Sequence, residues 1–572
     1  MRAPPPEPAL DGVPGSTTVL VVGGGPVGLV TSLLLTQQGI DHVVVERRTG
    51  GLAAPAAHVI GARTFEILRS AGVDMDQVLA ACAPAEDGAW VRWVTTLVGD
   101  ELGRVPFERQ HQLAELDVVT PTPLRNLSQH RLEAVLRDHV DGLAEGVEWA
   151  GSEQVPDGVT STLRDVWTGQ VGTVTSRYVV AADGAGSRIR GALGIPMEGP
   201  DVLQDFVMIH VAADLRHLVG ERPATLYWTM DPEVRGVFVA HDLGSTWVFM
   251  HDWDPESESF DEYTPERCAA LFRAAAGVED LDLVVEHVRP WRMSCQIAER
   301  YRDGHVFLVG DAAHRFPPTG GLGLNTGVAD AHNLVWKLAA VERGWARPGL
   351  LDSYETERRP VARSNADKSL DNALRMIEVL VACGVAGTPE EPRAAFDAAL
   401  ATDVGRAAIG EAIQGQDEHF DMLGLQLGFT YVEGDGPVLD DGTPPVAVDS
   451  PVREYAPSAR PGGRLPHAWV ERHGSRVSTL DLVQPGRFVL LTSSDAWAAA
   501  GDGLAAGTVP LDVVRMGSDV LDPDGAWDVV SGIGNSGAVL VRPDQHVAWR
   551  STGPAVDPPA ALAGALAELV AT

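Results

Sequence analysis

The sequence predicts an α/β protein of several domains, with a parallel sheet near its start. Three observations lead to this prediction. A β-branched run, Thr17–Val22, leads through a Gly-rich turn into helical sequence and a second strand, which is the order of a β-α-β unit. Residues 202–300 carry short, aromatic, alternating segments, a pattern typical of an antiparallel sheet with one covered face. Residues 434–465 are rich in Pro and Gly, which indicates a linker.

The first unit is expected to resume after the inserted segment. Helical sequence runs to Gln38, His42–Glu46 is the next strand, and Tyr178–Ala182 is a later one. The β run His305–Val309 returns to the same sheet, and a long helix follows from about Leu324. Beyond the linker, strands and helices alternate; the expected ones are Arg487–Thr492, Ser494–Ala499, Leu511–Met516, Ala538–Val541, Val547–Arg550 and Pro558–Val570.

These patterns divide the 572 residues into five parts. We expect a disordered N-terminus at 1–16, a first domain at 17–201 and 301–433 with a helical extension, an antiparallel-sheet domain at 202–300, a linker at 434–465 and a small α/β domain at 466–572.

Charge and composition exclude several classes of protein. The formal net charge is −35, and nucleic-acid binding needs clustered Lys and Arg, so no nucleic-acid partner is expected. No stretch approaches the roughly 20 apolar residues of a membrane span. The four cysteines are far apart and form no CxxC pair, which argues against a zinc site and fits a reducing cytoplasm. We expect a cytoplasmic protein without a metal or a membrane partner.

The first motif is G-x-G-x-x-G at Gly23, Gly25 and Gly28, between a strand and a helix. Gly23 permits a tight turn, Gly25 lets the backbone approach a pyrophosphate, and Gly28 lets the helix pack closely on the strand. Glu46 ends the next strand, where a carboxylate accepts hydrogen bonds from an adenosine ribose. The alternative is a chance Gly-rich turn, which the flanking strands and the acid disfavour. This motif alone does not separate NAD from FAD.

Two later segments indicate FAD. Asp183 and Asp311 each follow a strand directly, at the edge where ligands of open α/β sheets bind. Asp311 is placed to bond a ribityl or pyrophosphate-side hydroxyl. The loop that follows enters the long helix, and its backbone N–H groups are placed to stabilise negative charge on a flavin; the loop residues we expect at the cofactor are Pro318, Gly321, Gly323, Leu324 and Asn325.

Together these motifs resemble the class A flavoprotein monooxygenases, the family of para-hydroxybenzoate hydroxylase and phenol hydroxylase. The resemblance extends through 350–360 and through 127–133, the helix whose Gln, here Gln129, touches FAD in relatives. Residues 460–469 resemble the start of the C-terminal domain of longer members, and the chlorophenol-hydroxylase-like subgroup is the most similar.

The resemblance implies a glutathione-reductase-type FAD domain, an inserted antiparallel-sheet substrate domain and a C-terminal thioredoxin-like domain. The last contains no CxxC, so it is expected to be structural or to form contacts in a homo-oligomer. The implied reaction is hydroxylation of a phenolic or hydroxypyridine-type aromatic by NAD(P)H and O2, through a flavin C4a-hydroperoxide. The implied partners are FAD, NADH or NADPH, O2 and the aromatic substrate.

Three residues are candidates for the chemistry. The active-site Asp and Tyr of the fungal phenol hydroxylase pattern fall on His58 and Trp291, and a nearby Arg matches Arg289. We predict that His58, titrating near neutrality, bonds the substrate hydroxyl or acts as its base; the alternative is a polar residue lining the flavin edge. Trp291 is expected to be a pocket wall, and Arg289 either acts there or forms a structural ion pair.

A further departure concerns Ala56, where many relatives carry an Arg that contacts the FAD pyrophosphate. Arg47 and Arg125 are possible substitutes. Five aromatic residues of the middle segment are candidates for the substrate pocket, although strand spacing makes most of them core residues: Tyr227, Trp228, Phe238, Trp247 and Phe249.

Two other functions remain open on this scaffold: Baeyer–Villiger oxygenation of a ketone and non-catalytic flavin binding. The substrate is also open between chlorinated phenols, a polyketide-derived phenol and a hydroxypyridine. Nearly all basic residues are Arg, which suggests a GC-rich genome and favours secondary metabolism.

Overall fold

A computed structural model describes residues 9–109, 113–386, 391–431 and 436–571. Its first sheet has the order β18-β19-β10-β1-β2-β7. Its central strand β1 (Ser16–Val22) pairs in parallel with β2 (His42–Glu46) and β10 (Val171–Ala181). The other strands are β7 (Leu143–Glu145), β18 (Arg302–Asp303) and β19 (Val306–Leu308), with β8 (Val147–Val155) and β9 (Gly158–Asp165) continuing from β10.

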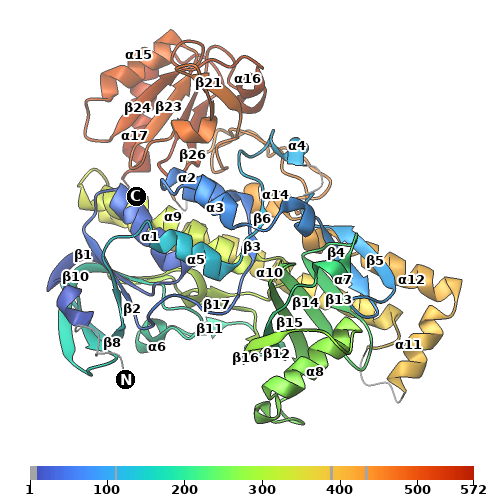
Figure 1. The fold of residues 1–572 in the computed structure, drawn as a ribbon. Coiled ribbons are helices and arrows are strands. Elements are labelled where there is room, and N and C mark those ends of the chain that lie inside the picture. Colours follow the sequence, from blue (N-terminus) through green and yellow to red (C-terminus); the bar gives the residue numbers. More distant parts are fainter. Residues whose placement is uncertain (1–8, 110–112, 387–390, 432–435, 572) are drawn as a thin grey trace.

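Apolar helices cover this sheet, because their buried side chains pack against its Val-rich strands. The helix α1 (Pro26–Gln37) packs against α9 (Leu322–Glu342) and α5 (Gln129–Arg137). These helices lie between the sheet and the C-terminal domain (Figure 1). The carboxyl ends of β1, β10 and β19 therefore meet at one edge, which faces the second sheet.

The second sheet has the order β16-β12-β15-β14-β13-β4-β5. Five strands come from the middle segment: β12 (Gln204–Ala212), β13 (Leu226–Thr229), β14 (Gly236–Asp242), β15 (Thr246–Trp253) and β16 (Val284–Met293). The helix α8 (Pro265–Ala276) covers one face. The other two strands are β4 (Trp90–Val94) and β5 (Glu101–Pro106), and β4 pairs in parallel with β13.

The boundary of the sheet domain at 202–300 is therefore corrected. Residues 90–106, which we had assigned to the first domain, complete the second sheet. Burial accompanies this pairing: Val91 and Trp93 of β4 have exposures of 0% and share a hydrophobic cluster with Met230, which follows β13.

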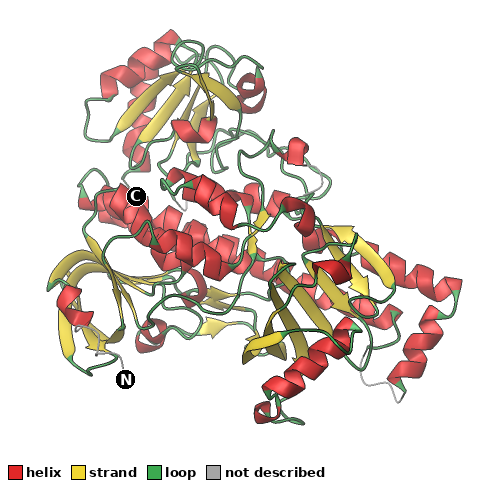
Figure 2. Cartoon of the chain, viewed as in Figure 1, coloured by secondary structure: helices red, strands yellow, loops and turns green. Residues whose placement is uncertain are grey.

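The C-terminal domain is a four-stranded sheet of order β24-β23-β25-β26, at the top of the view in Figure 2. The first pair is parallel and the other pairs are antiparallel. Its elements are β21 (Trp469–Arg472), β22 (Ser475–Ser478), β23 (Phe488–Thr492), α15 (Asp495–Leu504), β24 (Leu511–Arg515), α16 (Ala526–Ser531), β25 (Ala538–Val541), β26 (Val547–Ser551) and α17 (Pro558–Leu569). Its assignment as thioredoxin-like stays a prediction.

The expected linker and N-terminus are more ordered than anticipated. Residues 1–8 lie outside the described residues, but 9–12 form the 3-10 helix η1, because Leu10 and Val13 pack against the first core. Of the linker, 432–435 lie outside the described residues, and 436–465 contain no helix or strand. Ala459 and Leu465 are nevertheless buried in the C-terminal core.

The remaining elements connect the three units. The helices are α2 (Ala62–Ser70), α3 (Met75–Ala81), α4 (Leu113–Leu116), α6 (Arg188–Ala192), α7 (Arg216–Val219), α10 (Ser353–Ala382), α11 (Pro392–Leu400), α12 (Asp403–Gln414), α13 (Asp417–Phe420) and α14 (Leu423–Leu427). The short strands are β3 (Val59–Ile60), β6 (Arg125–Asn126), β11 (Met197–Glu198), β17 (Gln296–Ala298) and β20 (His314–Arg315). Among the described residues, we find no helix that is both long and apolar enough to span a membrane.

Candidate active site

A cavity of about 1150 Å³ lies between the carboxyl edge of the first sheet and one face of the second. It is continuous from the Gly-rich turn to the helix α10. Most of the residues predicted from the sequence line it: Gly23, Gly25, Glu46, Arg47, His58, Gln129, Asp183, Arg289, Trp291, Asp311, Pro318, Gly321, Gly323 and Leu324.

The Gly-rich turn has no room for larger side chains at two of its positions. Gly23 has φ of 115°, and a Cβ there would lie 2.1 Å from the carbonyl oxygen of Ala182. A Cβ on Gly28 would lie 1.9 Å from the oxygen of Gly23, so Gly28 sets the helix packing and does not itself line the cavity. Gly25 has open space where a Cβ would be, and this space belongs to the cavity.

Three carboxylates face this end of the cavity. Glu46 accepts hydrogen bonds from the backbone N–H of Gly24 at 2.7 Å and of Arg48 at 2.8 Å. Asp183 Oδ2 accepts from Arg188 N at 2.8 Å, while its Oδ1 is buried without a partner among the described residues. Asp311 is exposed to the cavity, and desolvation by the surrounding protein raises the pKa of its carboxyl.

The loop before α9 contains a glycine in the left-handed region. Gly321 has φ of 64°, and a Cβ there would lie 2.6 Å from Cβ of Val59. Asn325, however, does not line the cavity. Its Oδ1 accepts from Gly61 N at 2.8 Å and from Thr64 Oγ1 at 2.7 Å, so this side chain ties α2 to the first turn of α9.

The two candidate substitutes for an Arg at position 56 lie in different places. Arg47 lines the cavity. Arg125 lies in β6, beside Cys82, and is not among the cavity residues. Its guanidinium donates to the oxygen of Leu124. Gln129 lines the cavity and donates to Glu133 at 2.9 Å.

His58 sits where the cofactor end of the cavity meets the second sheet. Its Nδ1 lies 3.2 Å from Asn126 Oδ1, and Asn126 Nδ2 donates to the oxygen of Ala240 at 2.8 Å. Because the amide nitrogen of Asn126 is used, its oxygen must accept from Nδ1–H of His58, which leaves a lone pair on Nε2. The ring of His241 lies edge-on to His58, with centroids 5.2 Å apart.

The expectation that His58 titrates near neutrality is wrong. Desolvation by burial lowers the pKa of its ring to about 4, against the smaller raising effect of the bond to Asn126. The pKa of the neighbouring His241 is lowered well below its ordinary value by the same cause. Both rings are therefore neutral at pH 7.

Arg289 and Trp291 lie on β16 and line the cavity. Arg289 Nη2 donates to the oxygen of Pro55 at 3.3 Å, which brings it to the loop that contains Ala56. Burial, and then the charge of Arg48, lower its pKa. The Trp291 ring packs 5.7 Å from Phe206 on the adjacent strand, as expected of a pocket wall.

Of the five aromatic candidates on the second sheet, Trp228 alone lines the cavity. The others lie on the opposite face, in the core beneath α8: Tyr227, Phe238, Trp247 and Phe249. Alternation along each strand decides this, because neighbouring side chains point to opposite faces. The cavity face also carries apolar residues that were not predicted, five of which alternate with those aromatics while Met208 lies on β12: Met208, Leu226, Val237, Val239, Val248 and Met250.

Comparison with known proteins gives the class of this chain. Residues 16–369 match the FAD binding domain family, and residues 458–572 match the aromatic-ring hydroxylase C-terminal family. The 2,4-dichlorophenol 6-monooxygenase of Delftia acidovorans is 34% identical over 562 residues, which cover 94% of this chain and 95% of that protein. Aklavinone 12-hydroxylase RdmE of Streptomyces purpurascens is 35% identical over 562 residues, covering 96% and 98%.

A solved structure agrees over nearly the whole chain. The flavin-dependent monooxygenase PieE, in complex with FAD and substrate, matches with a TM-score of 0.90 and 35% identity, covering 97% of this chain and 99% of that one. The chain therefore belongs to the family of FAD-dependent aromatic-ring hydroxylases. It is a monooxygenase that hydroxylates an aromatic substrate with FAD as its cofactor.

Proposed function

We propose that this hydroxylase acts on a phenolic substrate of several rings, with NAD(P)H and O2 as co-substrates. The observation that carries the proposal is the apolar wall of the cavity. Four neighbouring strands contribute to it: Met208 on β12, Met250 on β15, Val239 on β14 and Trp228 on β13. Strands lie about 4.8 Å apart, so the wall is roughly 14 Å wide. A single phenol ring leaves most of such a wall uncovered, whereas a multi-ring substrate buries it.

The residues present at the other end of the cavity fit FAD. Only glycine fits at Gly23 and Gly28, and Gly25 leaves open space for a pyrophosphate. Glu46 is placed for the adenosine ribose, and the unpartnered Oδ1 of Asp183 provides an acceptor for a hydroxyl. Bound FAD supplies the redox chemistry that takes electrons from NAD(P)H and adds one atom of O2 to the aromatic ring.

The loop that begins at Pro318 and the Asp311 carboxyl complete this end of the cavity. The backbone N–H groups of Gly321, Gly323 and Leu324 stand at the N-terminus of α9, where the helix dipole favours negative charge. Asn325 holds this loop, because its Nδ2 donates to the oxygen of Gly321 at 2.6 Å while its Oδ1 accepts from α2 and the residue before it.

His58 is the residue that we assign to the substrate hydroxyl. Its Nε2 lone pair is fixed by the bond from Nδ1–H to Asn126. A phenol has a pKa of about 10, and the pKa of the His58 ring is lowered to about 4. Full transfer of the proton to Nε2 is therefore strongly uphill. His58 orients the hydroxyl by accepting its hydrogen bond, and Trp291 and Arg289 form the adjoining wall.

The test is a series of phenols with one, two, three and four fused rings. For each ligand, the rate of FAD reduction by NADH and by NADPH is measured by flavin absorbance, and products are analysed after turnover under labelled O2. We expect multi-ring phenols to accelerate reduction and to gain one labelled oxygen on a ring carbon. Higher kcat/KM for single-ring phenols would overturn the assigned substrate class. An oxygen inserted between two carbons, located by NMR, would indicate Baeyer–Villiger chemistry instead.

Location, oligomeric state and nicotinamide preference remain to be tested. A cytoplasmic location is supported by the four free cysteines, Cys82, Cys268, Cys295 and Cys383, since reduced thiols persist in a reducing compartment. The homo-oligomeric state is tested by size-exclusion chromatography. The preference between NADH and NADPH is measured in the same FAD reduction assay.

A further inference from the structure

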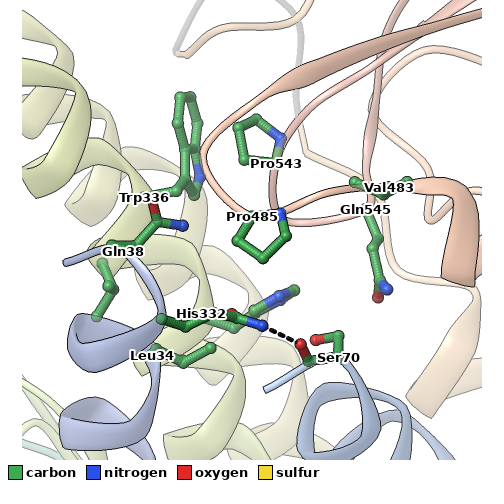
Figure 3. Close-up of a pocket in the computed structure, with 11 residues that line it drawn as sticks. Leu34, Gln38, Ser70, His332, Trp336, Val483, Pro485, Pro543 and Gln545 are labelled. Carbon is green, nitrogen blue, oxygen red and sulfur yellow. Dashed lines mark hydrogen bonds between the residues drawn. The ribbon is translucent and has the colours of Figure 1, made fainter. Parts of the chain in front are cut away.

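Fully buried charges join the C-terminal domain to the helices of the FAD site. The turn between β25 and β26 carries Arg542, and its Pro543 and Gln545 lie against Trp336 and His332 of α9 (Figure 3). These residues line a small cavity of about 20 Å³.

Arg542 forms ion pairs both with α10 and within its own domain. Its Nη1 and Nη2 donate to the two oxygens of Glu357 on α10 at 2.5 and 2.9 Å. Lys337 of α9 donates to the same carboxylate at 2.6 Å, and Asp544 accepts from Arg542 at 2.6 Å. The side chains of Arg542, Glu357 and Lys337 have exposures of 0%. One guanidinium of the C-terminal domain thus binds the same carboxylate that joins α10 to α9.

A second set of contacts runs from Arg542 towards the first sheet. The guanidinium lies 5.0 Å from the ring centroid of Tyr431, and the Tyr431 hydroxyl accepts from Arg358 Nη1 at 3.5 Å. Arg358 Nε donates to Asp330 Oδ1 at 2.8 Å. Asp330 Oδ2 then accepts from the backbone N–H of Gly310 at 3.2 Å.

Gly310 directly precedes the cavity carboxylate Asp311, so this path ends in the FAD site. Arg358 also donates from Nη2 to the oxygen of Thr326 at 3.2 Å, in the second turn of α9. His314 holds Asp330 from the other side, with Nε2 2.7 Å from Oδ2. Every side chain that carries this path is buried.

Stability alone is a poor reason for such an arrangement. Desolvating buried charges offsets most of their attraction, and apolar residues of the same volume often stabilise a fold equally well. What a bidentate guanidinium provides in addition is a fixed geometry. We propose that Arg542 is a positioning residue for FAD: from the C-terminal domain it holds α9 and the Gly310–Asp311 turn in the arrangement that binds the cofactor.

This inference rests on the FAD placement proposed above, and it is tested by cofactor binding rather than turnover. Arg542→Met removes both pairings, and Arg542→Lys keeps the charge but loses the bidentate geometry. The dissociation constant of FAD is measured by fluorescence quenching on apo-protein, alongside the thermal midpoint. We expect R542M to raise the constant roughly tenfold and R542K to raise it less. Faster amide exchange of 306–316 in both apo-variants is the second readout.

Arg69→Ala is the matched control. Arg69 also joins α2 to the C-terminal domain, through two bonds to Asp481 of 2.8 and 2.7 Å, but it has no bond to the path described above. We expect R69A to lower the thermal midpoint and leave the FAD constant unchanged.

The outcomes separate a positioning role from a stabilising one. FAD constants of R542M and R542K within about twofold of the wild type would overturn the proposal, as would R69A weakening FAD equally. If R542M does not fold, the FAD dissociation constant of R542K is compared with that of the wild type by the same twofold criterion. Failure of the substrate proposal leaves these FAD constants untouched. A wild-type protein that takes up no FAD would contradict the cofactor placement itself.

Discussion

His58 is a polar side chain of the cavity whose ring orientation is set by a hydrogen bond. Its Nδ1–H is committed to Asn126, its neighbour His241 is neutral, and its Nε2 lone pair remains. A neutral ring accepts hydrogen bonds over the whole physiological pH range, so its contribution does not change with pH there.

Replacing His58 by Ala should lower kcat roughly three- to tenfold, because the substrate hydroxyl loses one hydrogen bond in the transition state. FAD affinity should be unchanged. His58→Gln, which keeps an acceptor, should recover part of the loss. Steady-state kinetics between about pH 6 and about pH 8 check this. An inflection near pH 6.5 that disappears in the Ala variant would show that His58 ionises there and acts as a base.

Glu108 is a buried carboxyl outside the cofactor site. Burial, and then the charge of Asp421, raise its pKa to about 8, and its oxygen accepts from the Gln426 amide. Its pKa is about 4.3 in an unfolded chain. The folded state therefore holds a proton that the unfolded state loses, and stability falls as pH rises from about 4.3 to about 8.

Glu108→Gln should remove this loss, because Gln cannot ionise but still accepts from Gln426. At about pH 8.5 the variant should be more stable than the wild type by at least about 1 kcal/mol, and near pH 5 the difference should be much smaller. Thermal midpoints at both pH values measure it. If the stability difference between the variant and the wild type is the same at both pH values, Glu108 does not titrate in this pH range.

At the scale of one strand, β13 shows how alternation separates core from cavity. Tyr227 has an exposure of 1% and donates from its hydroxyl to the oxygen of Arg222 at 2.8 Å. Trp228, the next residue, points to the other face and lines the cavity. Of these two adjacent aromatic residues, Tyr227 therefore belongs to the core and Trp228 to the cavity wall.

Tyr227→Ala and Trp228→Ala form a matched pair. Tyr227→Ala should cost about 3–5 kcal/mol of folding free energy, as a large buried aromatic does. Trp228→Ala should cost less than half of that and raise KM for a multi-ring phenol roughly three- to tenfold. Urea unfolding and substrate titration measure the two effects. A KM unchanged in the Trp228 variant would remove this residue from the substrate wall.

Local patterns in the sequence were sufficient for the first sheet and for the Gly-rich and Asp segments, because each depends on neighbouring residues. They were insufficient for β4 and β5, because β4 joins the sheet through β13, more than a hundred residues away, and β5 pairs with β4. They also misplaced Arg125 and Asn325 relative to the cavity. Both residues stand beside cavity segments in the chain, but Arg125 donates to the oxygen of Leu124 and Asn325 bonds residues at the start of α2. Sequence spacing does not reveal where a side chain points.

At the scale of the whole molecule, several histidines are buried and neutral. Desolvation lowers the pKa of His419 to about 3 and of His467 to about 4, and holds those of His241 and His332 well below the ordinary value. In the unfolded chain each has a pKa of about 6.5. Their contribution to stability is present above pH 6.5 and is lost as pH falls towards 4.

We expect the free energy of unfolding to fall between about pH 6.5 and about pH 4, by up to about 1.4 kcal/mol per pH unit for each such histidine. His467→Gln should make this fall shallower by about one proton, while the dependence above pH 7 stays the same. Urea unfolding at several pH values measures both slopes. Parallel slopes for the two proteins would show that His467 binds its proton equally in both states.

The route of the chain through the second sheet limits how this enzyme exchanges parts with its relatives. The strands β4 and β5 are encoded well before the five strands that they complete, so no single continuous segment contains the whole sheet that carries the substrate wall. A chimera that imports residues 202–300 alone would confront a foreign β13 with the native β4 and risk leaving an unpaired edge. The substrate wall thus depends on a sheet built from two separated stretches of sequence, which must remain compatible when either one changes.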